Sequence, residues 1–255
     1  RNTGNKKPGG TTAMSLPDWT RPADLRGQLQ KRWDRGELLR ACLPQAEPMF
    51  PLQLRLKKPN SNDLSNRFEQ VRQWISQLQQ LDARYRLQYR EINHRQLGRN
   101  QIPDCVWVDR LEDALQLLGQ QRAARQFEHL ANSSLDLFPA LHPWLSKHPL
   151  RALEQAAYWQ QILAVLHWFS AHPHSQLYLR QLDIPGVDTK FIEQRRGLLG
   201  ELLDLVLPAT HINEQSRGVK GFCRRYGLLD KPQRIRMRIL DPRLAIAGLT
   251  DLEVP

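Results

Sequence analysis

The stretch IPGVDTKFIEQRRGLLGELLDLVLP, residues 184–208, decides the fold of the C-terminal part of the chain. Pro185 and Gly186 are typical of a turn, and Asp188 is of a residue type that caps helices. Beyond Asp188, apolar residues recur at helical spacing until Pro208 ends the pattern. We expect these apolar side chains to pack inward: Phe191, Ile192, Leu198, Leu199, Leu202 and Leu203. The stretch therefore predicts a turn followed by a capped helix with one buried face.

Elements of both kinds flank this helix. Residues 153–173 are apolar on most sides, which predicts a core helix, and residues 176–184 predict a short strand or an extended segment. After the helix, residues 233–240, QRIRMRIL, place an arginine at every second position, so a strand here would have one apolar and one basic face. Helix, short strand, turn, helix and basic strand is the order of a winged-helix domain, although many other α+β domains share it.

The N-terminal part of the chain mixes helices and strands. Helical spacing and strand-like alternation follow one another along it, at residues 22–43, 50–59, 64–82, 85–98 and 104–109. Two further helices follow before the three prolines of residues 137–150, which forbid a long helix and indicate a boundary. These patterns predict an α+β fold, with a mixed α/β module at residues 14–140 and a winged-helix domain at residues 141–243.

Composition limits the environment and the partners. The net charge of the 255 residues is +11, and residues 208–243 contribute +6 of it, from nine basic and three acidic residues. Such a local concentration of positive charge is typical of proteins that bind polyanions, and a solvated face that only aids solubility is the alternative. Three scattered cysteines, no signal peptide and no long apolar run predict a cytoplasmic protein without a membrane span.

We expect three groups of basic side chains to contact the phosphates of double-stranded DNA. They lie on the helix after Asp188, in the glycine-punctuated stretch RGVKGFCRRYG (217–227), and on the alternating strand. The candidates are Lys190, Arg195, Arg196, Arg217, Lys220, Arg224, Arg225, Arg234, Arg236 and Arg238. The alternatives are an ion pair of Glu193 with Arg195 or Arg196, a disordered basic loop, and an edge strand protected by its charge from aggregation.

Four blocks of the sequence resemble one known family. They are WDRGELL (33–39), NHRQLGRNQIPDCVWVD (93–109), IPGVDTKFIEQRRGLLGELLDLVLP (184–208) and FCRRYGLLDKPQRIRMRILDP (222–242), and they occur in the same order. From about Met14 to its end, the chain is similar to the N-terminal half of the JetD-like nuclease subunits of Wadjet systems. Residues 1–13 are expected to be an expression-tag remnant or a disordered tail.

The resemblance implies a protein of anti-plasmid defence. JetD-like subunits act with an SMC-like ATPase complex that recognises and cleaves closed circular DNA, and they are similar to the A subunit of topoisomerase VI. That similarity implies an N-terminal arm, a winged-helix domain like that of CAP, and a C-terminal Toprim domain that binds Mg²⁺. It also implies a homodimer in which each subunit serves one DNA strand.

The acidic residues of a Toprim domain are missing from this sequence. Such a domain needs a glutamate and a later Asp-x-Asp to hold Mg²⁺, and the chain has no Asp-x-Asp. We therefore expect a fragment without cleavage activity of its own, in which residues 244–255 begin a linker to the missing domain. The full-length protein is expected to be a Mg²⁺-dependent DNA endonuclease. Within these 255 residues no catalytic residue, metal ligand or cofactor is assigned.

Two functions remain open from the sequence. In the first, the chain binds DNA and organises the dimer of the nuclease. In the alternative, it is a protein-docking adaptor that seats the nuclease on the SMC-like complex and has no direct role in binding DNA.

Overall fold

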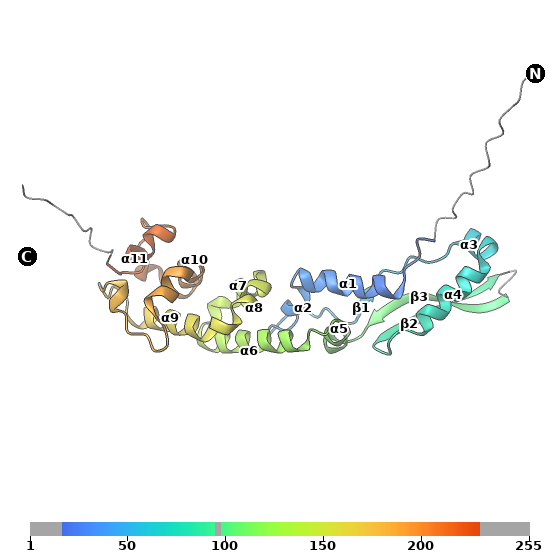
Figure 1. Ribbon diagram of the computed structural model, residues 1–255, viewed down its shortest axis with the longest axis horizontal. Helices are drawn as coiled ribbons and strands as arrows, with labels where there is room; N and C mark the ends of the chain where they lie inside the picture. The colour runs from blue at the N-terminus through green and yellow to red at the C-terminus, as the bar shows by residue number, and fades with distance from the viewer. Residues whose placement is uncertain (1–16, 95–97, 230–255) are drawn as a thin grey trace, which may run out of the picture. The chain divides into compact units, whose positions relative to one another are not determined.

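The computed structural model describes residues 17–94 and 98–229, and it shows an α+β fold (Figure 1). The chain divides into two compact units, residues 1–163 and 164–255. The division falls within helix α9 (Trp159–Ala171). The domain limits expected from the sequence stay predictions.

The first unit contains most of the helices and the sheet. Its helices and strands, in chain order, are α1 (Pro22–Asp34), α2 (Glu37–Arg40), β1 (Leu52–Leu54), α3 (Ser61–Asn66), α4 (Phe68–Gln79), β2 (Tyr85–His94), β3 (Gly98–Val108), α5 (Leu111–Leu118), α6 (Gln121–Leu137), η1 (Pro139–Leu141), α7 (His142–Lys147), α8 (Pro149–Glu154) and η2 (Ala156–Tyr158).

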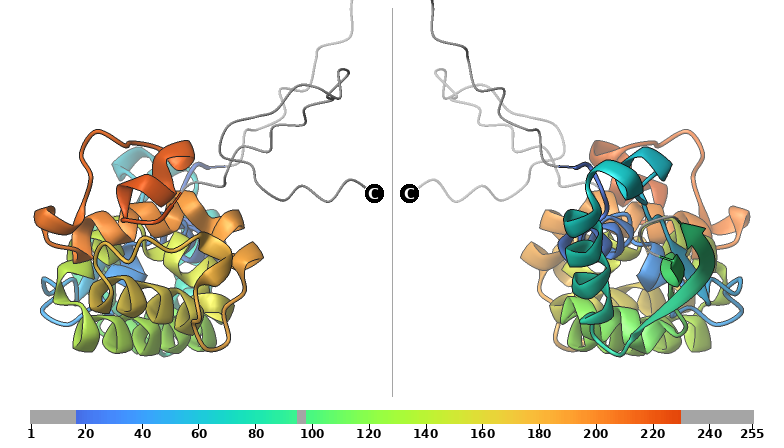
Figure 2. Two further views of the ribbon diagram at one scale, coloured as in Figure 1. Left: turned by 90° about the vertical axis from the view of Figure 1, so that its left-hand side faces the viewer. Right: turned by 90° about the vertical axis from the view of Figure 1, so that its right-hand side faces the viewer.

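The sheet is antiparallel, with strand order β1-β3-β2. Strand β3 pairs with β2 along its whole length, from Tyr85 opposite Val108 to His94 opposite Gly98, with one irregularity between Gln88 and Tyr89. Helix α4 packs against β3, and the right-hand view of Figure 2 shows α3 and α4 beside the curving ribbon. Residues 98–101 of β3 are exposed, so the far end of the ribbon projects into solvent.

The core of the first unit follows the apolar spacing of the sequence. Buried side chains come from one face of each main helix and from the near end of the sheet; among them are Leu25, Leu29, Trp33, Val71, Trp74, Leu78, Val106, Val108, Leu115 and Phe127. The helix expected over residues 22–43 is interrupted at Gly36, whose φ of 70° is a left-handed conformation that glycine adopts without strain. A Cβ there would lie 2.5 Å from Pro149 Cγ, so the interruption lets α8 approach.

One buried hydrogen bond fixes the beginning of α9 in the first unit. Trp159 Nε1 donates to Ser134 Oγ at 2.7 Å, and Ser134 in turn donates to the Leu130 carbonyl oxygen at 2.6 Å. Both side chains are buried, and the Trp159 ring stacks on Trp144. The two bonds satisfy the buried polar groups of Trp159 and Ser134.

The second unit is built around helix α10. Its further elements are η3 (Leu179–Gln181), α10 (Thr189–Val206), η4 (Ala209–His211), η5 (Val219–Gly221) and α11 (Phe222–Arg225). The rings of Phe169, Phe222 and Tyr226 pack edge to face with centroids 5.0 to 6.1 Å apart, and they close the core against the buried face of α10.

Of the two expectations for residues 176–184, a short strand or an extended segment, the strand does not form, whereas Tyr178 and Leu182 are extended. These residues form a 3₁₀ turn, together with two isolated bridges, Tyr178 to Leu229 and Ile184 to Val187. The alternation of apolar residues there reflects burial of Leu179 and Ile184 on either side of a turn, because no neighbouring strand among the described residues offers a ladder.

Candidate nucleic-acid interface

Helix α10 begins as the sequence predicts. The Asp188 carboxylate accepts a hydrogen bond from the Phe191 backbone N–H at 2.6 Å, which satisfies one of the free donors of the first turn. The six apolar residues expected to pack inward are all buried. The capping interaction and the buried face together fix which side of α10 is left to solvent.

Three candidate residues lie on α10. Lys190 is exposed in the first turn. Arg195 has a non-helical backbone conformation (φ −113°, ψ 15°), and its guanidinium lies 4.4 Å from the centroid of the Phe191 ring. Arg196 forms the expected ion pair with Glu193, at 3.6 Å, so part of its charge is balanced on the helix itself.

The turn η5 lies against the middle of α10. A Cβ at position 197 would lie 4.0 Å from Val219 Cγ2, an ordinary van der Waals distance, so the turn lies next to this part of the helix. The turn carries Lys220, and Arg217 precedes it; both are exposed. This contact places the basic turn beside the helix that carries Lys190, Arg195 and Arg196.

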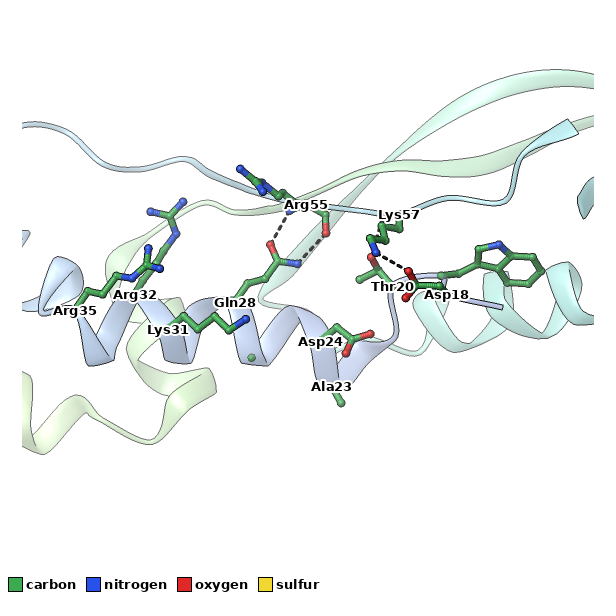
Figure 3. A pocket seen from close by; sticks show the side chains of 12 residues that line it. Asp18, Thr20, Ala23, Asp24, Gln28, Lys31, Arg32, Arg35, Arg55 and Lys57 are labelled. Carbon is green, nitrogen blue, oxygen red and sulfur yellow. Dashed lines mark hydrogen bonds and ion pairs between the residues drawn. The ribbon is translucent and has the colours of Figure 1, made fainter. Parts of the chain in front are cut away.

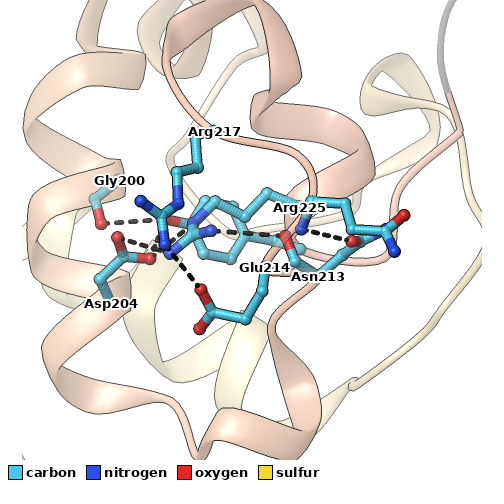
Figure 4. A network of polar contacts seen from close by, with 8 residues as sticks. Gly200, Asp204, Asn213, Glu214, Arg217 and Arg225 are labelled. Carbon is cyan, nitrogen blue, oxygen red and sulfur yellow. Dashed lines mark hydrogen bonds and ion pairs between the residues drawn. The ribbon is translucent and has the colours of Figure 1, made fainter.

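Arg225 belongs to a network of hydrogen bonds within the second unit (Figure 4). Its Nε and Nη2 atoms each donate to the Asp204 carboxylate at 2.9 Å, and only 11% of its side chain is exposed. Its Nη1 also donates to the Asn213 carbonyl oxygen at 3.3 Å. A guanidinium held by a carboxylate in this way has few donors left for phosphate.

Tyr226 completes the same network. Its hydroxyl lies 2.6 Å from Asp204 Oδ1 and 2.9 Å from the Gly200 carbonyl oxygen. Burial, and then the hydrogen bond to Asp204, raise the pKa of Tyr226 well above its usual value. The phenol therefore stays protonated and acts as a structural hydrogen-bonding group.

The remaining candidates differ in their exposure to solvent and in their ion pairs with carboxylates. Arg217 pairs with Glu214 at 3.4 Å, but both side chains are largely exposed, so water and salt weaken this pair. Arg224 is exposed on α11. No carboxylate in residues 17–94 or 98–229 forms an ion pair with Lys190 or Lys220. Arg234, Arg236 and Arg238 lie outside the described residues.

The acidic residues of the described chain do not gather into a metal site. Within the ranges that the structure describes, no three side chains of the His, Cys, Asp and Glu types are placed as metal ligands. Asp188 is the helix cap and Asp204 the partner of Arg225. Tyr158, which belongs to the stretch 153–173 expected to form a core helix, is 45% exposed on η2.

Sequence reasoning named no basic residue of the first unit. The structure nevertheless brings five of them around one cleft: Lys31, Arg32, Arg35, Arg55 and Lys57. The sequence signal is weak, because two short groups are separated by some twenty residues with no basic excess. Only the pairing of α1 with the segment after β1 unites them.

None of the helices in the described ranges combines the length and the apolar character that crossing a bilayer requires.

The comparisons with known proteins identify a family. No curated protein matches the chain. The family model described as "Uncharacterized protein conserved in bacteria N-term (DUF3322)" matches residues 22–204. Since this match covers more than half of the 255 residues, the chain belongs to the DUF3322 family of bacterial proteins.

Proposed function

We propose that the chain is the DNA-binding and dimer-organising N-terminal part of a JetD-like nuclease subunit. In this proposal the full-length, cytoplasmic protein carries a Mg²⁺-dependent Toprim domain and cleaves plasmid DNA together with an SMC-like complex. The resemblance of four sequence blocks supports the assignment, and it is compatible with membership of a bacterial family matched over residues 22–204.

The contact of η5 with α10 supports the proposal that the chain binds DNA. Because η5 contacts α10 near Gly197, the basic turn and the exposed side of α10 form one neighbourhood in the second unit. Lys190, Lys220 and Arg224 are exposed there, and Arg217 is only weakly balanced by Glu214. Exposed basic side chains contact phosphates through counterion release, which gives affinity with little sequence preference.

The proposal also includes the fold of the second unit. We infer a winged-helix domain in which α10 approaches a groove of the DNA and the alternating stretch 233–240 forms the wing. The order of α9, the turn at Pro185 and Gly186, and α10 supports it. A basic wing would add Arg234, Arg236 and Arg238 to the same surface.

Removing the charges of Lys190 and Lys220 tests the DNA interface. The double variant Lys190→Gln/Lys220→Gln of the whole chain is expected to bind a DNA duplex up to about 60-fold more weakly at about 100 mM salt, with a log–log salt slope smaller by about 1.8, if each lysine neutralises one phosphate. Fluorescence anisotropy across a salt series measures both quantities.

The matched control is Arg122→Gln/Lys147→Gln, which removes the same charge from exposed positions of the first unit. If both double variants weaken binding equally, only net charge matters and the interface is misplaced. If the chain binds duplex weakly and with no salt slope, the adaptor alternative replaces DNA binding, and the chain should instead bind the SMC-like complex in the absence of DNA.

A further inference from the structure

A basic cleft lies in the first unit, between α1 and the segment that follows β1 (Figure 3). Its volume is about 750 Å³. Lys31 and Arg32 lie in the last turn of α1 and Arg35 directly follows it, whereas Arg55 and Lys57 lie on the opposite wall. The two walls come from parts of the sequence about twenty residues apart, so the cleft exists only in the folded unit.

Polar bonds hold the two walls at a fixed separation. The Gln28 side-chain amide both donates to the Arg55 carbonyl oxygen and accepts from the Arg55 N–H, each at 2.8 Å. Nearby, the Thr20 N–H donates to the Lys57 carbonyl oxygen at 3.0 Å, and the Lys57 N–H donates to Thr20 Oγ1 at 2.7 Å. Because these bonds occupy the backbone of residues 55 and 57, a ligand is recognised by side-chain charge and not by strand addition.

The cleft has an excess of positive charge. Two carboxylates line it, and both are already engaged: Asp18 binds Lys57 Nζ at 2.6 Å, and Asp24 accepts from the Arg21 N–H at 2.7 Å. Glu37, outside the cleft, lies 2.7 Å from Arg32 and 3.8 Å from Arg35. Among the described residues, no carboxylate forms an ion pair with Lys31 or Arg55, and both side chains are exposed.

Small residues of α1 line part of the cleft. Ala23 and Gly27 lie one turn apart on α1, and a Cβ at position 27 would meet no atom within 4 Å. An extended ligand can therefore approach the helix backbone between the two basic walls. Cations in the last turn of α1 also suit the negative end of the helix dipole, but that does not account for the cations of the opposite wall.

We propose that this cleft binds a phosphodiester backbone, supplied either by a nucleic-acid strand or by a free short oligonucleotide. Arginine presents paired donors that fit phosphate oxygens, and several cations on two walls suit a ligand whose charges repeat along its length. The cleft shares no residue with the α10 and η5 surface, and the proposal does not depend on DNA binding there. An acidic peptide is the competing ligand, which the experiment distinguishes.

The test uses the whole chain and the double variant Lys31→Gln/Arg55→Gln. Neither side chain has a described carboxylate partner, and Gln28 binds the backbone of residue 55, so the fold should persist; circular dichroism checks this. For a single-stranded oligonucleotide of about five nucleotides, affinity is expected to fall by about 25-fold at about 100 mM salt, and the salt slope by about 1.4. The control Arg26→Gln/Arg125→Gln removes equal charge outside the cleft and should change affinity much less.

The probes separate the sources and the competing ligand. Binding of the short oligonucleotide alone supports a free strand, and a loss seen only with a duplex supports a cleft that holds the outer backbone of double-stranded DNA. Equal affinity of the wild-type chain and the cleft variant for both probes overturns the proposal. So does a poly-glutamate peptide that binds the cleft as tightly as the oligonucleotide. The Lys190→Gln/Lys220→Gln variant reports separately on the second unit.

Discussion

Replacing Asp204 with asparagine is expected to lower the free energy of unfolding by about 2 kcal/mol. Asp204 accepts two hydrogen bonds from Arg225 and lies 2.6 Å from the Tyr226 hydroxyl. An amide keeps the shape but loses the charge, and it turns a donor toward one of these donors. The Arg225 side chain, 11% exposed, then keeps its charge without its partner. We place the cost below that of a fully buried pair because Asp204 is 41% exposed. Urea unfolding followed by circular dichroism measures it.

The control is Glu214→Gln, which breaks an ion pair of the same type in the same unit. The Arg217 and Glu214 side chains are 81% and 64% exposed, so the change in unfolding free energy should stay within about 0.5 kcal/mol. The duplex affinity of a folded Asp204→Asn variant should match that of the wild type. If its affinity rises instead, releasing Arg225 creates a phosphate contact, and the guanidinium is not purely structural.

The helix at the centre of the second unit could be predicted because its signals are local. A cap, an apolar face and a terminal proline lie within one stretch of 25 residues, and each is interpretable without knowing the rest of the chain. The segment 176–184 could not be predicted from its own pattern. Alternating burial also arises on a 3₁₀ turn, and the partner needed to form a strand is a property of the whole fold.

The sequence likewise does not show which basic residues of the candidate site are engaged within the fold. The sequence ranks Arg217, Lys220, Arg224 and Arg225 alike, since all four lie in one basic stretch. Folding separates them, because Asp204, twenty-one residues earlier, captures Arg225. The cleft of the first unit was missed because its basic residues are apart in the sequence and come together only on folding. Its five cations lie in two modest groups, which the bonds of Gln28 with Arg55 and of Thr20 with Lys57 bring together.

The end of the described chain is fixed by a close contact at Gly227. Its carbonyl oxygen accepts from the Gln176 N–H at 2.9 Å, and two residues later the Leu229 N–H donates to the Leu177 carbonyl oxygen at 2.9 Å. These bonds set the direction in which the chain leaves α11. Residues 233–240, which carry three of the candidate arginines, begin four residues after Leu229 in the sequence.

Replacing Gly227 with alanine is expected to lower the free energy of unfolding by about 3 kcal/mol. Its φ of 76° is strained for any residue with a Cβ, and that Cβ would lie 2.7 Å from His174 Cα and 3.0 Å from His174 N, which are backbone atoms that cannot rotate away. Gly186→Ala is the matched control, because φ is 73° there and nothing lies within 4 Å of the added Cβ, so only strain of about 1 kcal/mol remains. Chemical unfolding of both variants measures the difference. Equal losses would mean that residues 174–176 move aside easily, and the exit of the chain would then not be fixed by this contact. A larger loss at Gly227 means that the close approach of the His174 backbone, in addition to the positive φ, opposes a side chain at this position.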